Sequence, residues 1–87
     1  MNIDYVFDSV RSEREYQKQV WPNSKKISVL GEITLLRSYL RQFEDHYQEL
    51  DDAARMDVPE PCLHDLRKMA AILIRAMENH GAPKRMW

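Results

Sequence analysis

The sequence contains few of the residues that interrupt helices or cross-link chains. Its 87 residues include two glycines, four prolines and one cysteine, Cys62. A single cysteine cannot form an internal disulfide. Few glycines and few β-branched runs, together with many Glu, Gln, Arg, Leu and Met residues, favour helices over strands. The composition therefore predicts an all-α chain.

An excess of one charge and a long apolar run are also missing. The formal net charge is −1, which argues against a general nucleic-acid binder, because such a protein needs a clear basic excess. The longest apolar run, Met69 to Ile74, is far too short to cross a bilayer. No secretory signal is visible at the N-terminus. We therefore expect a soluble, cytoplasmic protein with no membrane partner.

Hydrophobic periodicity predicts one domain over residues 1–87, with helices at about 3–20, 27–52 and 61–79 and a basic tail over 81–87. The second helix has the clearest apolar stripe, so we expect it to be the spine of the domain. Its stripe advances in steps of three and four residues: Ile33, Leu36, Leu40, Phe43, Tyr47 and Leu50. The expected core stripe of the third helix is Leu63, Leu66, Ala70, Leu73 and Met77.

Proline-marked breaks separate the predicted helices. Pro22 ends the first, Pro59 and Pro61 precede the third, and Gly81 ends it. Ser24 is the predicted N-cap of the second helix. Short connections favour an up-down-up unit, and its apolar surface is wider than one partner helix can cover. We therefore expect a helical bundle completed by a homo-oligomer, a dimer or higher.

Several short motifs resemble small MazG-like proteins, notably those common in phages. They are Glu13–Gln17, Trp21, Leu30–Glu32, Leu66–Ala71 and the closing Ala76–Pro83. The resemblance spans most of the chain and implies an all-helical bundle. Enzymatic members of that family cleave nucleoside triphosphates to monophosphate and pyrophosphate with Mg²⁺, which is held by a Glu-Glu-x-x-Glu helix and a later Glu-x-x-Asp helix.

The chain departs from this family pattern at the metal ligands. Glu32 matches the first carboxylate, but Ile33 and Leu36 stand at the next two positions. On the third helix Asp65 matches the first acid, whereas Lys68 replaces the second. An ammonium group at close range repels a divalent cation. We therefore expect no hydrolysis by the family mechanism, no catalytic residue and no metal ligand.

A lysine in place of a metal ligand can instead neutralise phosphate directly. The leading hypothesis is a non-catalytic protein that binds a nucleotide or cyclic nucleotide without a cofactor and sequesters a nucleotide signal, in the host cytoplasm if the chain is of phage origin. Aromatic side chains would stack on the base. The expected binding residues are Trp21, Lys25, Lys26, Glu32, Tyr39, Asp65 and Lys68.

Structural roles remain open for the same residues. Glu32 and Asp65 fit ordinary helix acids, Trp21 and Tyr39 fit core aromatics, and the stem of Lys68 could cover apolar surface. Two other functions also remain open. One is a divergent Mg²⁺-dependent nucleoside triphosphate pyrophosphohydrolase, and the other is an interaction module that acts on a host protein.

Overall fold

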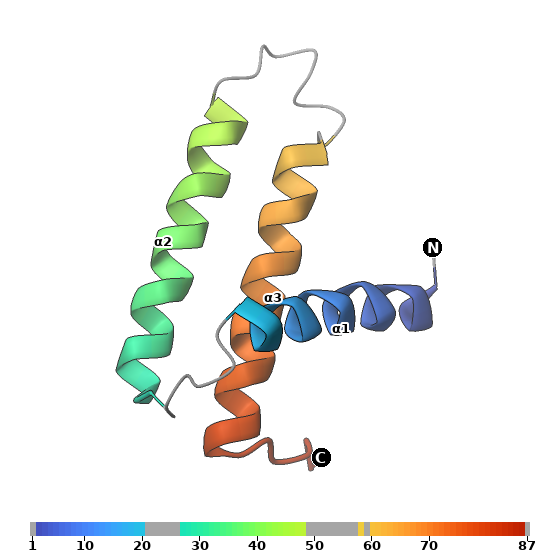
Figure 1. Ribbon diagram of the computed structural model, residues 1–87, viewed down its shortest axis with the longest axis vertical. Helices are drawn as coiled ribbons and strands as arrows, with labels where there is room; N and C mark the ends of the chain where they lie inside the picture. The colour runs from blue at the N-terminus through green and yellow to red at the C-terminus, as the bar shows by residue number, and fades with distance from the viewer. Residues whose placement is uncertain (1, 21–26, 49–57, 59, 87) are drawn as a thin grey trace.

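The computed structural model describes residues 2–20, 27–48, 58 and 60–86. These residues form three helices, α1 (Ile3–Val20), α2 (Val29–Gln48) and α3 (Glu60–His80), and contain no strand (Figure 1). The all-α class is therefore confirmed. The predicted bounds match α1, differ by one residue at each end of α3 and by two residues at the start of α2. The predicted extension of the second helix to 52 lies outside the described residues.

α3 is the central element of the fold. It packs on both other helices, more extensively on α2 than on α1. α2 and α3 run antiparallel as a hairpin, whereas α1 crosses α3 instead of lying alongside it (Figure 1). Two sequence predictions are thus corrected: the third helix, not the second, is the spine, and α1 does not continue an up-down-up arrangement.

Local hydrogen bonds explain where the helices begin and end. The Asn2 side chain accepts from the Tyr5 N–H at 2.9 Å, and the Ser28 hydroxyl accepts from the Gly31 N–H at 3.0 Å. Both satisfy amides that have no partner within the helix. The N-cap of α2 is therefore Ser28, not the predicted Ser24, which lies outside the described residues. Gly81 ends α3 with a positive φ of 118°, as its position predicted.

In the described part of the chain, the interior contains more polar than apolar side chains. Among the described residues, the buried apolar ones are Cys62, Ala71 and Ile72, and the buried polar ones are Glu13, Arg14, Gln17, Glu32 and Asp65. Burial raises the pKa of the Cys62 thiol, and the nearby Asp65 carboxylate adds to the shift. Cys62 is therefore a buried, neutral thiol, consistent with a structural role.

The predicted core stripe of the third helix is mostly exposed. Leu63, Leu66, Leu73 and Met77 are 42–50% exposed, so the sequence prediction is wrong for this face within one chain. The neighbouring face of α3, with Asp65 and Ile72, turns inward because ion pairs join it to α2. None of the described helices has an apolar stretch that could cross a membrane.

Candidate functional site

A bidentate ion pair joins α2 to α3. Arg75 donates from Nε and Nη2 to the two carboxylate oxygens of Glu32, at 2.9 and 2.8 Å. The Glu32 side chain is 1% exposed and that of Arg75 is 14% exposed. A buried carboxylate needs such a partner, because desolvation strongly penalises an unpaired charge. Glu32, which matches the first metal ligand of the resembled family, is thus neutralised by an arginine of the same chain.

A second buried carboxylate is paired near the other end of the hairpin. Asp65 lies 2.5 Å from Nδ1 of His46, and its side chain is 2% exposed. His46 and Glu32 are about four helical turns apart on α2, or about 20 Å along its axis. Glu32 and Asp65 therefore do not converge on a common point.

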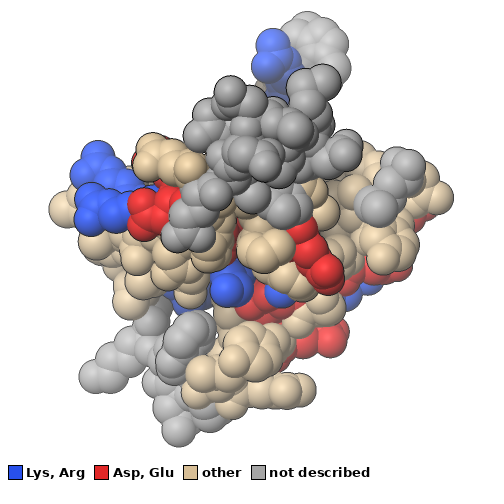
Figure 2. Space-filling model, turned by 90° about the horizontal axis from the view of Figure 1, so that it is seen from above, with Lys and Arg blue, Asp and Glu red and all other residues tan. Residues whose placement is uncertain are grey.

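Charged side chains also join α1 to α3. Glu13 accepts from Nε of Arg67 at 2.9 Å. Arg14 donates from Nε and Nη2 to the Glu78 carboxylate at 3.1 and 3.0 Å. Nη1 of Arg14 donates to the Gln17 side-chain oxygen at 3.0 Å. These contacts hold the crossing of α1 over α3, where apolar burial is small. On the face seen in Figure 2, basic and acidic side chains likewise lie next to one another.

A groove lies beside this crossing, where α1 approaches both other helices. Two cavities of about 200 and 380 Å³ share three lining residues and form its two ends. We call it the Tyr16–Lys68 groove, and its lining residues are Ser12, Glu13, Tyr16, Gln17, Val20, Tyr39, Arg67 and Lys68. Its size reaches the lower end of the range typical of small-molecule sites.

Two polar side chains in the groove have unused hydrogen-bonding capacity. Lys68 makes no ion pair or hydrogen bond with the described residues, in contrast to the arginines around it. Gln17 is 4% exposed, and its side-chain oxygen accepts from Arg14. Its amide nitrogen has no protein partner in the part of the chain that the structure describes. The groove therefore offers a cation and an amide donor to a ligand.

Of the residues predicted to bind a nucleotide, Tyr39 and Lys68 meet in the groove, although they come from different helices. Glu32 and Asp65 do not line the groove, since both side chains are turned into the α2–α3 interface. The other residues predicted to bind the nucleotide, Trp21, Lys25 and Lys26, lie outside the described residues.

Among the groove residues that the sequence prediction omitted are three from one stretch of α1: Glu13, Tyr16 and Gln17. All three belong to the first motif of the MazG-like resemblance. Their spacing of three and four residues places them on one side of α1. This spacing was the available signal, but nothing in the sequence indicated that this side of α1 faces Lys68.

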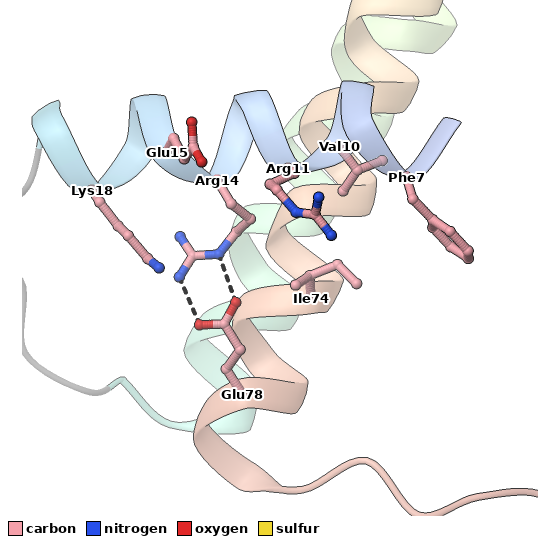
Figure 3. Close-up of a pocket in the computed structure, with 8 residues that line it drawn as sticks. All are labelled: Phe7, Val10, Arg11, Arg14, Glu15, Lys18, Ile74 and Glu78. Atoms are coloured by element: carbon pink, nitrogen blue, oxygen red, sulfur yellow. Dashed lines mark hydrogen bonds and ion pairs between the residues drawn. The ribbon is translucent and has the colours of Figure 1, made fainter. Parts of the chain in front are cut away.

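Another cavity, of about 390 Å³, lies beside the contact of α1 with α3 and is lined by residues of both helices (Figure 3). Phe7, Val10 and Ile74 form its apolar wall, and Arg11 and Lys18 are among its basic residues. Figure 3 shows the Arg14–Glu78 pair between Lys18 and Ile74, with both groups turned toward each other. Arg14 and Arg11 are paired with Glu78 and Asp8, so among the described residues Lys18 is the unpaired cation of this cavity, which lacks the two tyrosines of the groove.

The stability of the chain should fall at low pH through the Arg14–Glu78 pair. The hydrogen bond from Arg14 lowers the pKa of Glu78, more than its burial raises it, and the charges of Arg14 and Lys18 add to the lowering. A carboxyl with a lowered pKa stabilises the folded state above its ordinary pKa, and this contribution is lost as the pH falls through the lowered value. The Glu78 side chain is 45% exposed, so solvent screening limits the contribution to below about 1 kcal/mol.

Urea unfolding at about pH 7 and about pH 3 tests this expectation. Glu78→Gln should reduce the loss of unfolding free energy between the two pH values. Asp8→Asn is the matched control, since Asp8 forms an exposed pair with Arg11. A pH dependence that is identical in the wild type and in Glu78→Gln would contradict the assignment.

Among the described residues, no three His, Cys, Asp or Glu side chains lie close enough together to hold a metal ion. Glu32 and Asp65 in particular do not fit a shared Mg²⁺ site, because they are far apart and each is already bound by a side chain of the same chain, Arg75 and His46 respectively. Comparisons with protein-family models, curated proteins and solved structures find no match for this chain.

Proposed function

We propose that this chain binds a nucleotide or cyclic nucleotide in the Tyr16–Lys68 groove without hydrolysing it. The observation that carries the proposal is the meeting of Lys68 with two tyrosines in one groove. An unpaired ammonium group attracts phosphate, and aromatic rings stack on any base because every base has a flat π face. The amide nitrogen of Gln17 is a donor for a base edge or a phosphate oxygen.

The absence of hydrolysis is proposed from the carboxylates. Glu13, Glu32 and Asp65 are bound by Arg67, Arg75 and His46 respectively. A magnesium ion would have to displace these side chains before it could use the carboxylates as ligands. The MazG-like resemblance is consistent with a nucleotide as the ligand, and sequestration of a nucleotide signal is the corresponding biological role. On this proposal, the chain binds a ligand of the class that the MazG-like family acts on, but it lacks the carboxylate ligands for that family's metal chemistry.

Isothermal titration of the full chain against linear and cyclic nucleotides tests the proposal. We expect binding of at least one nucleotide, with no pyrophosphate or monophosphate released when Mg²⁺ or Mn²⁺ is added. Tyr39→Leu should weaken binding about tenfold, as expected for the loss of one stacking contact. The matched control is Tyr5→Leu, because Tyr5 is an exposed tyrosine that does not line the groove.

Two results would contradict the proposal. If no nucleotide in the panel binds, the groove has another role or none. If pyrophosphate is released in the presence of Mg²⁺, and the Asp65→Ala variant loses this activity, the chain is the divergent pyrophosphohydrolase instead.

A further inference from the structure

The side of the α2–α3 hairpin that faces away from α1 is broadly apolar. On α3, Arg67, Ile74 and Glu78 are turned toward α1, through ion pairs or a shared cavity. Leu66, Leu73 and Met77 each precede one of them by a single residue. Successive helical residues are about 100° apart, so these three side chains are turned away from α1. They are 42–45% exposed.

α2 contributes a matching row to the same side. Glu32 contacts α3, and Tyr39 lines the groove beside α1. Ile33 and Leu40 follow them by one residue, and Val29 lies one turn before Ile33. A step of one residue rotates the side chain around the helix axis, away from the groove. Because α2 and α3 are antiparallel (Figure 1), Val29, Ile33 and Leu40 therefore lie on the same side of the hairpin as Leu66, Leu73 and Met77. Leu40 is 43% exposed and Val29 is 52% exposed.

We infer that a second copy of this chain covers this hairpin face, which we define by Val29, Ile33, Leu40, Leu66, Leu73 and Met77. None of the six carries a charge, so the most complementary surface that the chain itself offers is the same face of another copy. An interface of this kind is isologous, as in most two-fold symmetric dimers. Two antiparallel hairpins packed in this way make a four-helix bundle with α1 of each copy on the outside.

The dimensions of the face fit this occupant. A helix of about 20 residues is about 30 Å long, and packed helices lie about 8–10 Å apart. The hairpin face therefore measures roughly 30 by 20 Å, or about 600 Å² before side-chain relief is added. A stable interface buries about 800 Å² on each partner. Two such faces together measure about 1,200 Å², which is the lower end of the range of about 1,200–2,000 Å² that stable interfaces bury in total.

The small apolar core of one chain also favours association with a second copy. Among the described residues only Cys62, Ala71 and Ile72 are buried apolar side chains, and small domains with little apolar burial commonly gain stability by association. Covering the hairpin face would bury Leu40 and Leu73 against apolar atoms. The predicted stripe of the third helix would then become core between copies, although it is exposed within one chain.

Light scattering coupled to size-exclusion chromatography tests this inference on the full chain at high micromolar concentration. We expect a mass of at least twice 10.4 kDa. Leu40→Glu and Leu73→Glu should each lower the apparent mass toward that of one chain. The matched control is Leu35→Glu, since Leu35 is also an exposed leucine on α2 but lies outside the hairpin face.

Cross-linking keeps the test decisive if the glutamate variants fail to fold. Leu40→Cys and Leu35→Cys are milder changes, and the buried Cys62 contributes little background. With a short bis-maleimide, Leu40→Cys should give a covalent dimer several times more efficiently than Leu35→Cys. A single-chain mass for the wild type, dissociation by Leu35→Glu alone, or equal cross-linking at the two positions would each overturn the inference.

Discussion

Replacing Arg75 with methionine should lower the unfolding free energy by about 3–5 kcal/mol. Arg75 supplies two hydrogen bonds to Glu32, whose side chain is 1% exposed. Methionine keeps much of the apolar stem but leaves the carboxylate without a counter-charge. A buried carboxylate without a partner must either stay desolvated or take up a proton, and both cost free energy. The loss is a large part of the stability typical of a small domain. Urea unfolding followed by circular dichroism measures it.

Two further variants separate the effect of the buried charge from other effects of the substitution. In the double variant Glu32→Met with Arg75→Met, the charge is gone and most of the stability should return, because apolar replacements of a buried pair are often neutral. Arg11→Met removes an exposed ion pair with Asp8 and should change stability by less than about 0.5 kcal/mol. A loss of under about 1 kcal/mol in the single variant would contradict the structural importance of this pair.

The helices could be predicted from the sequence because their signals are local. Apolar periodicity, the prolines between segments and Gly81 all act within a few residues, so bounds such as Ile3–Val20 were recovered closely. The N-cap of α2 was missed because two serines, Ser24 and Ser28, stand near its start. Only the hydrogen bond from the Gly31 N–H identifies Ser28.

The polar interior could not be predicted, because the partners of each ion pair are distant in sequence. Glu32 and Arg75 lie on different helices, and so do Glu13 and Arg67. Periodicity also identifies an apolar face without indicating what covers it. The stripe through Leu73 was therefore assigned to the core of one chain, although it is exposed there.

The candidate site was predicted in part for a related reason. Tyr39 was selected as an aromatic side chain and Lys68 as a replaced metal ligand, and the antiparallel pairing of α2 with α3 brings both to one groove. Glu32 and Asp65 were selected from the same family pattern, but that pattern assumes that carboxylates converge on a metal. Here each carboxylate has its own partner side chain, Arg75 for Glu32 and His46 for Asp65, so the family geometry does not carry over.

Reversing the charge of Lys68 should have the largest effect on nucleotide binding. Two unit charges about 4 Å apart interact by about 4 kcal/mol where the effective dielectric constant is about 20. Lys68→Glu replaces an attraction to phosphate with a repulsion. Even after relaxation and screening, we expect the affinity to fall at least about 100-fold. Isothermal titration with whichever nucleotide the wild type binds measures this change.

Lys84→Glu is the matched control, because it makes the same change in net charge at an exposed lysine that does not line the groove. Its effect should be within about threefold, since long-range interactions between exposed charges are screened by salt. The loss of affinity in Lys68→Met should lie between those in Lys68→Glu and Lys84→Glu, because this change removes the attraction to phosphate without adding a repulsion. If Lys68→Glu and Lys84→Glu weaken binding equally, the ligand responds only to net charge, and the groove is not where phosphate binds.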